Sequence, residues 1–314
     1  MPNLLEIKDL VVGYEKGPPI VEDFFLTVEA GEVLALVGES GCGKSLTGLA
    51  VLGLLPAGIQ IKKGKILFKG KDLAGLSPRE YVRLRGREIA IIFQDPMVSL
   101  NPVFTVGDQI AEVLCWHQGL SKKEALKQAE ALLREVGIPA ARERLKAYPH
   151  ELSGGMRQRV MIAMALAGQP ALLIADEPTT ALDVTIQAQI LELLAKLREQ
   201  HQLTILLISH DLGVVAELAD RVAVMYAGRL VEMTTCHRLY QQPRHPYTEA
   251  LLEALPRPGK KTLTVLPGVV PPPGKRPEGC KFQPRCPGAR KNCTREEPPL
   301  KEVERGHWVR CFYA

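Results

Sequence analysis

The sequence G-x-x-x-x-G-K-S at residues 38–45 limits the possible folds of this chain more than any other feature. Residues 33–37 before it form an apolar run typical of a buried strand, and residues 46–55 after it have helical composition up to Pro56. In this setting the glycines let consecutive backbone N–H groups converge on an anion, and the helix N-terminus adds partial positive charge. The motif therefore predicts a phosphate-binding loop made of these residues: Gly38, Glu39, Ser40, Gly41, Cys42, Gly43, Lys44 and Ser45.

Two side chains at the end of this loop predict how a nucleotide is bound. Lys44 is expected to reach the β- and γ-phosphates. The Ser45 hydroxyl is expected to bind Mg²⁺, which combines a few protein oxygens with phosphate and water oxygens. By itself the pattern also fits a glycine-rich turn that binds nothing, so the remaining motifs have to decide.

Length and charge restrict the class of protein. The 314 residues are enough for one main domain and a smaller appendage. The net charge of +5 is too small to indicate nucleic-acid binding and is compatible with work beside an anionic membrane surface. No apolar run approaches the ~20 residues that span a bilayer, and residues 1–10 lack the layout of a signal peptide, so we expect a cytoplasmic protein.

Several short segments have β composition. Residues 4–12 and 20–28 flank a turn and predict an antiparallel pair ahead of the phosphate loop, and residues 64–70 predict a further short strand. A hairpin is expected around Ala227 and Gly228. Tyr14 closes the first of these segments, where ordinary packing and stacking on an adenine both suit its ring.

Four polar residues directly follow apolar runs that we expect to be strands: Gln94, Asp176, Glu177 and His210. The carboxyl ends of strands form the edge at which α/β sheets place ligands. Two adjacent carboxylates there are costly without a cation or a proton, so Asp176 is expected to bind Mg²⁺ and Glu177 to act as a base toward water. His210 shares that edge if the strands are parallel neighbours. Gln94 is placed to contact a metal or water, although a loop residue is the commoner role for one glutamine.

The middle of the chain has a helical pattern. Residues 106–137 contain a capping box formed by Ser121 and Glu124, and Gly137 ends that helical stretch. A further helix begins at the sequence Leu152, Ser153, Gly154 and Gly155. Its serine fits an ordinary helix N-cap, while the paired glycines also permit a second phosphate site at this helix start.

Four of the seven cysteines lie close to the C-terminus: Cys280, Cys286, Cys293 and Cys311. Their segment has too few apolar residues to fold around its own core, and in a reducing compartment such a group indicates metal binding rather than disulfides. The spacing C-x₅-C-x₆-C-x₁₇-C lacks the close pairs of structural zinc sites and the C-x₂-C-x₂-C run of bacterial ferredoxins. Spacing alone therefore leaves Zn²⁺ and an iron–sulfur cluster both open.

The ordered motifs GESGCGKS, LSGGM, LLIADE and ALD, with Gln94 and His210, resemble the nucleotide-binding subunit of ABC transporters across residues 1 to about 235. LSGG is the discriminating element, because phosphate loops occur in many NTPases. The stretches IIFQDPMVSLNP and HPYTEALL resemble the ATPase subunits of dipeptide and oligopeptide importers, which extends the resemblance over nearly the whole chain.

The resemblance implies an α/β fold with four parts. These are an ABC-type P-loop NTPase core, an antiparallel β subdomain, an α-helical subdomain at about residues 100–168, and a small cysteine-rich C-terminal extension. The nucleotide-binding domain is expected at residues 1–235 and the extension at residues 236–314. Within the extension, the resemblance implies that the cysteines at 280–311 bind a [4Fe–4S] cluster, with Zn²⁺ as the alternative.

The resemblance also implies roles at the nucleotide. Tyr14 stacks on the adenine, and Lys44 holds the β- and γ-phosphates of ATP. Ser45 and Asp176 position Mg²⁺, and Gln94 contacts the metal and the attacking water while facing a membrane subunit.

Further roles concern hydrolysis and a partner subunit. Glu177 polarises the attacking water and His210 contacts the γ-phosphate. Asp183 couples the two sites of a dimer, and the signature residues Ser153 and Gly155, with Leu152 and Gly154, close on ATP held by the opposite subunit.

The function implied by the resemblance is an ATPase subunit that couples Mg-ATP hydrolysis to uptake of dipeptides or oligopeptides. It is expected at the cytoplasmic face of the membrane, paired with a second homologous ATPase subunit under two transmembrane permease subunits. A solute-binding protein acts indirectly, and nucleic acid takes no part. Importers of nickel and other small solutes share the pattern. A soluble ABC ATPase of translation or DNA repair is a different class, disfavoured because those proteins carry two cassettes or a long coiled-coil insertion.

Overall fold

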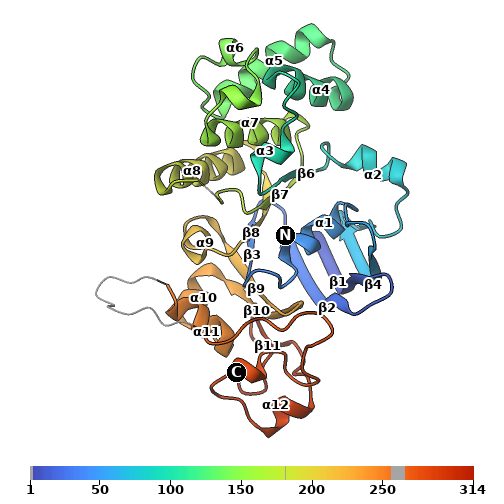
Figure 1. Ribbon diagram of the computed structural model, residues 1–314, viewed down its shortest axis with the longest axis vertical. Coiled ribbons are helices and arrows are strands. Elements are labelled where there is room, and N and C mark those ends of the chain that lie inside the picture. The colour runs from blue at the N-terminus through green and yellow to red at the C-terminus, as the bar shows by residue number, and fades with distance from the viewer. Residues whose placement is uncertain (1–2, 181, 256–265) are drawn as a thin grey trace. The chain divides into compact units, whose positions relative to one another are not determined.

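The computed structural model describes residues 3–180, 182–255 and 266–314, and the chain divides into two compact units. The first unit comprises Met1–Gly75 and Leu207–Ala314, and the second comprises Leu76–Leu206 (Figure 1). The two ends of the chain therefore belong to the same unit. Strand β8 (Thr204–Ser209), buried throughout its length, crosses the boundary between the units.

The first unit contains an antiparallel sheet with the strand order β2-β1-β4-β5. Its strands are β1 (Asn3–Tyr14), β2 (Pro19–Glu29), β4 (Ile59–Phe68) and β5 (Lys71–Asp72). The predicted antiparallel pair ahead of the phosphate loop is confirmed, since β1 pairs with β2 from Asn3 opposite Glu29 to Gly13 opposite Pro19, with several shifts of register. Leu5, Ile7, Leu10 and Val12 of β1 are fully buried, and the alternation of buried side chains shifts by one residue at the irregularity between Ile7 and Leu10.

A second set of strands in this unit has the order β11-β12-β10-β9-β3. The strands are β3 (Val33–Val37), β9 (Arg221–Tyr226), β10 (Arg229–Thr235), β11 (Lys301–Glu304) and β12 (His307–Val309). The expected hairpin is confirmed, because β9 and β10 are antiparallel and Ala227 and Gly228 between them have φ of 45° and 82°. Beyond β10, strand β12 pairs with it through Glu232 opposite Val309, so the end of the chain extends this sheet.

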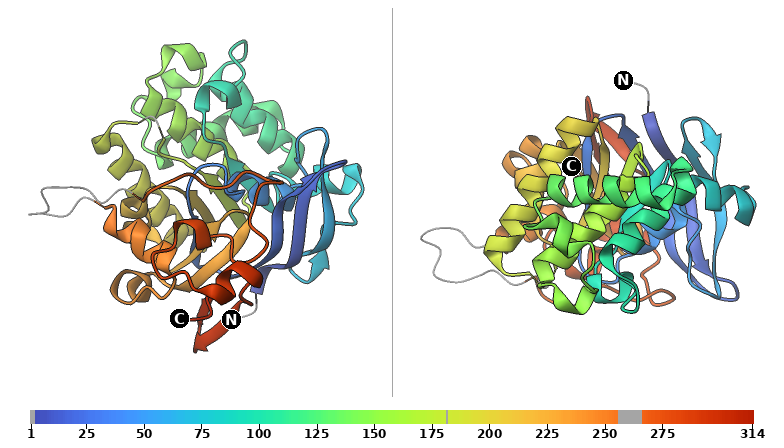
Figure 2. Two further views of the ribbon diagram at one scale, coloured as in Figure 1. Left: turned by 60° about the horizontal axis from the view of Figure 1, so that its bottom comes forward. Right: turned by 90° about the horizontal axis from the view of Figure 1, so that it is seen from above.

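The helices of the first unit are short: α1 (Lys44–Val51), α9 (Leu212–Leu218), α10 (Cys236–Gln241), α11 (Pro246–Glu253) and α12 (Lys291–Arg295). Figure 2 shows the last of these beside the C-terminal strands, in red. A 3₁₀ turn at Gln283–Arg285 lies between two of the cysteines.

The second unit consists of two parallel strands and a set of helices. Strand β6 (Ile89–Ile92) pairs with β7 (Leu172–Asp176), from Ile89 opposite Leu172 to Ile92 opposite Ala175. The helices are α2 (Pro78–Leu84), α3 (Pro96–Ser99), α4 (Val106–Gln118), α5 (Lys122–Glu135), α6 (Ala141–Arg144), α7 (Gly154–Ala167) and α8 (Val184–His201), with a 3₁₀ turn at Pro149–Glu151. The predicted capping box of Ser121 and Glu124 is present at the start of α5. In that helix Ala125, Ala129 and Leu133 are fully buried at a spacing of four, which fixes its inner face.

Two boundaries differ from those expected. Helix α1 ends at Val51 rather than at residue 55, because Gly53 takes a φ of 61° that stops the helical path. Strand β4 begins at Ile59, five residues before the predicted strand, because it pairs with β1 as far as Tyr14 opposite Ile59. Among the helices in the described ranges, none is both long and apolar enough to cross a membrane.

Candidate functional site

The phosphate loop of the first unit follows directly from the fully buried strand β3. Gly38 has a φ of 152°, and a Cβ atom there would lie 2.1 Å from the Met225 carbonyl oxygen. Gly43, with a φ of 110°, forms the N-cap of α1, and a Cβ atom there would lie 3.0 Å from Cγ2 of Val21. Glycine is therefore required at both ends of the turn, because β9 and β2 pack directly against the loop.

Lys44 is buried beneath the loop, with only 5% of its surface exposed. Its Nζ donates to the carbonyl oxygens of Gly38 at 2.7 Å and Glu39 at 3.2 Å. The ammonium is thereby held at the turn that the motif predicts for phosphates. Ser40, Gly41 and Ser45 are exposed, so the outer face of the loop is accessible to an anion. Cys42 is buried, and burial raises the pKa of its thiol, which keeps it neutral.

Glu39, the second residue of the loop, is bound by two residues from far along the chain. Arg285 donates from both terminal nitrogens to the Glu39 carboxylate, at 2.5 Å and 2.9 Å. The Glu39 backbone N–H donates to the hydroxyl of Tyr247 at 2.9 Å. These bonds raise the pKa of Arg285, whose hydrogen bonds to Glu39 are the largest cause. Hydrogen bonds from the C-terminal part of the chain to Glu39 thus hold the phosphate loop in place.

An aromatic cluster supports these two residues. The rings of Tyr226, Tyr247 and Phe282 pack with centroids 4.6 to 5.4 Å apart. All three side chains are fully buried or nearly so, at 0 to 1% exposure. No sequence motif singles out Arg285, Tyr226 or Phe282 as functional, whereas Tyr247 lies within the stretch HPYTEALL.

In the second unit, the structure brings Gln94 and Glu177 together. Strands β6 and β7 are parallel neighbours, and the two residues follow their carboxyl ends. The side-chain amide of Gln94 donates to Oε2 of Glu177 at 2.8 Å, and the hydroxyl of Thr180 donates to the same oxygen at 2.9 Å. Glu177 has a φ of 49°, a conformation uncommon for a side chain of this kind, and it follows the buried Asp176.

The signature residues begin a helix, and Asp183 begins another. The Ser153 hydroxyl accepts from the Met156 N–H at 3.3 Å, and Asp183 accepts from the Ile186 N–H at 2.9 Å. Both residues therefore act as N-caps, of α7 and α8 respectively. A Cβ atom on Gly155 would lie 2.7 Å from Cγ2 of Ile186, so only glycine allows these two helix starts to approach so closely.

The remaining predicted nucleotide residues belong to the first unit. Tyr14 ends β1 with 47% of its surface exposed, and His210 follows β8 and is exposed. The structure thus places Tyr14, the phosphate loop and His210 in one unit. Gln94, Asp176, Glu177, the signature residues and Asp183 are all in the other.

The four C-terminal cysteines form no disulfide bonds, and the backbone N–H of Cys280 donates to the carbonyl oxygen of Cys293 at 2.8 Å. Burial raises the pKa of the Cys280 thiol to about 11, and the neighbouring Cys293 and Cys311 contribute in the same direction. Burial likewise raises the thiol pKa values of Cys286 and Cys311. Within the part of the chain that the structure describes, no group of three or more His, Cys, Asp or Glu side chains is arranged to hold a metal ion.

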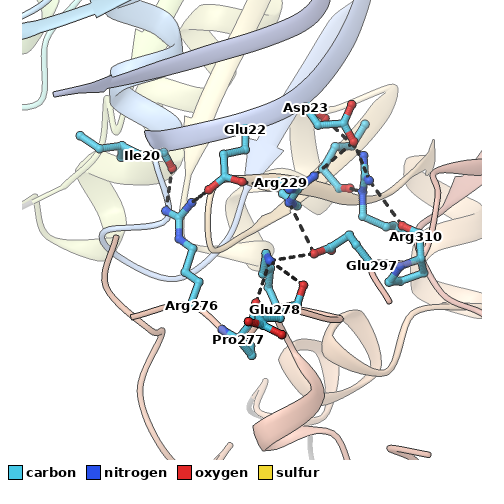
Figure 3. Close-up of polar contacts among 12 residues, drawn as sticks. Ile20, Glu22, Asp23, Arg229, Arg276, Pro277, Glu278, Glu297 and Arg310 are labelled. Atoms are coloured by element: carbon cyan, nitrogen blue, oxygen red, sulfur yellow. Dashed lines mark hydrogen bonds and ion pairs between the residues drawn. The ribbon is translucent and has the colours of Figure 1, made fainter. Parts of the chain in front are cut away.

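Buried arginines attach the C-terminal segment to the rest of the first unit, through ion pairs that no sequence motif indicates (Figure 3). Arg276 pairs with Glu22 at 2.9 Å and Arg310 pairs with Asp23 at 2.8 Å, while Arg229 of β10 contacts both acidic residues. The side chains of Arg276 and Arg310 are 5% and 4% exposed. These ion pairs hold to β2 a segment that the sequence indicates has too few apolar residues to fold around its own core.

His307 and Trp308, which shortly precede Cys311, pack against Glu232 of β10 and Phe25 of β2. His307 is fully buried and its Nε2 lies 2.7 Å from a carboxylate oxygen of Glu232. That carboxylate also accepts from the backbone N–H groups of Arg244 and His245, at 2.8 Å and 2.9 Å. Trp308 lies beside Phe25, with ring centroids 6.1 Å apart.

Two family models match this chain. The ABC transporter model matches residues 21–180, which is half of the chain, and the model for the oligopeptide/dipeptide transporter C-terminal region matches residues 231–293. The first match includes the phosphate loop, Gln94, the signature residues and Glu177. The second includes Tyr247 and Arg285, the residues that fix the loop from behind.

Similar proteins extend over the whole chain. The oligopeptide transport ATP-binding protein AppD of Bacillus subtilis is 50% identical over 318 residues, covering 99% of this chain and 97% of that protein. The dipeptide transport ATP-binding protein DppD of Escherichia coli is also 50% identical, covering 99% and 96%.

Solved structures share the fold of the cassette. A dimeric post-hydrolysis state of the ATP-binding cassette MJ0796 bound to ADP and Pi has a TM-score of 0.66 at 26% identity, covering 74% of this chain and 98% of that one. The structure of cbiO1 from Clostridium perfringens has a TM-score of 0.68 at 28% identity, covering 77% and 92%. The phosphate loop, the carboxylates after β7 and these matches together identify an ATP-hydrolysing cassette that uses ATP and Mg²⁺. This chain belongs to the ABC transporter family, among the ATP-binding proteins of oligopeptide and dipeptide transporters.

Proposed function

We propose that this chain hydrolyses Mg-ATP to drive the import of dipeptides or oligopeptides. The observation that carries the proposal is the 50% identity to named oligopeptide and dipeptide transport ATP-binding proteins over 99% of the chain. The match of residues 231–293 to the C-terminal region of such transporters supports it. Nickel or another small solute is the alternative cargo.

The test is uptake by the assembled complex in vesicles with its solute-binding protein. Labelled dipeptide, labelled oligopeptide and nickel are supplied separately, with and without internal ATP. ATP-dependent peptide uptake is expected, whereas uptake of nickel alone assigns the chain to the alternative cargo. If the chain does not co-purify with permease subunits, the result favours a soluble ABC ATPase.

The first unit is assigned the nucleotide-binding roles. The loop from Gly38 to Ser45 binds the phosphates, with Lys44 at the β- and γ-phosphates. Tyr14 stacks on the adenine and His210 contacts the γ-phosphate. The buried ammonium of Lys44, held at the turn, and the exposed ring of Tyr14 support these assignments.

Residues of the second unit are assigned two roles, binding Mg²⁺ and activating the attacking water. Asp176 binds Mg²⁺ with Ser45 of the loop, and Glu177 acts as the base toward the attacking water. Two hydrogen-bond donors, Gln94 and Thr180, orient the Glu177 carboxylate, and this supports its role. Gln94 also links the metal and water to the membrane subunit.

The working assembly is a head-to-tail pair with a second homologous ATPase subunit, docked on two permease subunits at the cytoplasmic face of the membrane. Ser153 and Gly155 close on the ATP of the opposite subunit, and Asp183 couples the two sites. The position of Ser153 and Asp183 at the starts of two closely packed helices supports a shared role for them. Two solved structures of the similar cassette MJ0796 are dimeric, which also supports this arrangement.

Residues 236–314 form a C-terminal extension of the nucleotide-binding domain of residues 1–235, and its four cysteines bind a [4Fe–4S] cluster or, alternatively, Zn²⁺. The backbone hydrogen bond from Cys280 to Cys293 supports this assignment, because it holds two of the four cysteines together. The described side chains do not have the arrangement of a metal site, so loading would require their thiols to reorient and ionise. Anaerobically purified protein is expected to be brown with about four irons per chain; colourless protein with one zinc assigns the alternative.

A further inference from the structure

This inference rests on the proposed function, in which the loop of residues 38–45 binds the phosphates of ATP, and Glu39 places a carboxylate within that loop. A carboxylate next to this anion-binding turn opposes the binding of a triphosphate, because like charges repel most strongly where water is partly excluded. The loop itself supplies one ammonium, that of Lys44, which is held by backbone carbonyls of Gly38 and Glu39. A separate cation is therefore needed to neutralise Glu39.

Arg285 supplies that cation, and its position is fixed by several acceptors. Besides its paired bonds to Glu39, it donates from Nε to the Pro267 carbonyl at 2.8 Å and contacts the Tyr226 hydroxyl at 3.4 Å. Its side chain is 5% exposed, whereas that of Glu39 is 30% exposed. The guanidinium is thus held rigidly behind the loop, and the bidentate geometry also sets the orientation of the Glu39 side chain.

We propose that Arg285 is a positioning residue of the phosphate loop, which neutralises and orients Glu39 so that the loop presents net positive charge to the phosphates of ATP. It acts from the turn between Cys280 and Cys286, 246 residues along the chain from Glu39. Tyr247 fixes the backbone of the same residue. The C-terminal part of the chain therefore contributes directly to the affinity for ATP.

A purely structural role makes a different prediction, because Arg285 would then serve only to tether the C-terminal segment. Under the electrostatic role, the harmful feature of Arg285→Gln is the unneutralised Glu39 carboxylate, so removing that charge as well restores binding. Under the structural role, a second substitution at Glu39 gives no recovery. The ATP affinity of the double variant therefore distinguishes the electrostatic role of Arg285 from the structural one.

The experiment measures the dissociation constant of a fluorescent Mg-ATP analogue for the full-length chain and the ATPase activity of the assembled complex. Arg285→Gln is expected to weaken binding by about tenfold, while kcat at saturating ATP stays within about twofold. Glu39→Gln with Arg285→Gln is expected to bind within about threefold of the native chain. Arg285→Lys keeps the charge but loses the paired hydrogen bonds, so its dissociation constant is expected to lie between those of the native chain and Arg285→Gln.

Arg310→Gln is the matched control. Arg310 is an equally buried arginine of the same C-terminal segment, but it pairs with Asp23 rather than with the loop. The substitution Arg310→Gln is expected to lower the unfolding temperature without changing the affinity for ATP. Unchanged affinity in Arg285→Gln overturns the proposal, and so does a double variant that binds ATP as weakly as Arg285→Gln.

Discussion

Replacing Phe282 by alanine is expected to destabilise the first unit strongly, because this ring joins the C-terminal segment to the body of the unit. Phe282 is 1% exposed and packs against Tyr226, Tyr247 and His245, with centroids 5.2, 5.4 and 5.8 Å away. Substitutions of this kind cost about 3–5 kcal/mol, from lost burial and from the cavity left behind. For a domain of about 150–250 residues, each 1 kcal/mol shifts Tm by about 2–4 °C, so a fall of at least about 6 °C is expected.

The assay uses tryptophan fluorescence in a chain that carries Trp116→Phe. This leaves Trp308, on β12 of the first unit, as the remaining tryptophan of the two in the sequence. Phe282→Leu, which keeps much of the apolar volume, is expected to cost less than Phe282→Ala. Tyr313→Ala is the exposed control, because that ring is 43% exposed and its removal is expected to change Tm by less than about 2 °C. A Phe282→Ala chain that unfolds within about 2 °C of its parent refutes the packing role.

Three further predictions follow from named groups. Lys44→Ala is expected to weaken ATP binding by at least about tenfold, because the positive charge at the β- and γ-phosphates is lost, and equilibrium binding of Mg-ATP measures it. Gly155→Ala is expected to lower the free energy of unfolding, measured by denaturant titration, by about 1–3 kcal/mol, because its Cβ atom would lie 2.7 Å from Cγ2 of Ile186. Adding Ile186→Ala to the same chain should restore most of that loss. Burial lowers the pKa of His245 in the folded chain to about 4, whereas its pKa in the unfolded chain is about 6.5. The neutral imidazole therefore contributes its full stability above a pH of about 6.5, and this stability is lost as the pH falls from about 6.5 toward about 4. Denaturant titrations across that range should show the loss, and His245→Asn, which keeps an acceptor for the N-cap bond to Tyr247, should reduce the slope.

Local signals in the sequence predicted the local structure well. The capping box of Ser121 and Glu124 and the turn at Ala227 and Gly228 were predicted, because each depends on backbone conformations and hydrogen bonds within a few residues. The glycine loop was predicted for the same reason, and its Gly38 does require the absence of a side chain. The apolar runs before Gln94 and Asp176 were predicted as strands, but their parallel pairing as β6 and β7, which brings Gln94 and Glu177 together, was not predicted.

Long-range contacts were not predicted. The pair of Arg285 and Glu39 joins residues 246 positions apart, and neither has a periodic pattern that indicates the other. Strand β12 is three residues long, too short for an alternating pattern, yet it pairs with β10. Helix α1 ends earlier than its composition suggested, because one glycine with positive φ outweighs the helical propensity of the residues after it.

Glu177 is the proposed base for the ATP hydrolysis that drives peptide import, so the most direct test is ATP-dependent peptide uptake by the assembled complex with Glu177→Gln. Glutamine keeps an oxygen that can accept from Gln94 and Thr180 but cannot take a proton from water. The native complex is expected to import peptide and hydrolyse ATP. The variant is expected to bind Mg-ATP normally and to lose roughly 10²–10⁴-fold in hydrolysis, with uptake lost in step. Undiminished hydrolysis in the variant, or a native complex that hydrolyses ATP but imports no peptide, would contradict this account.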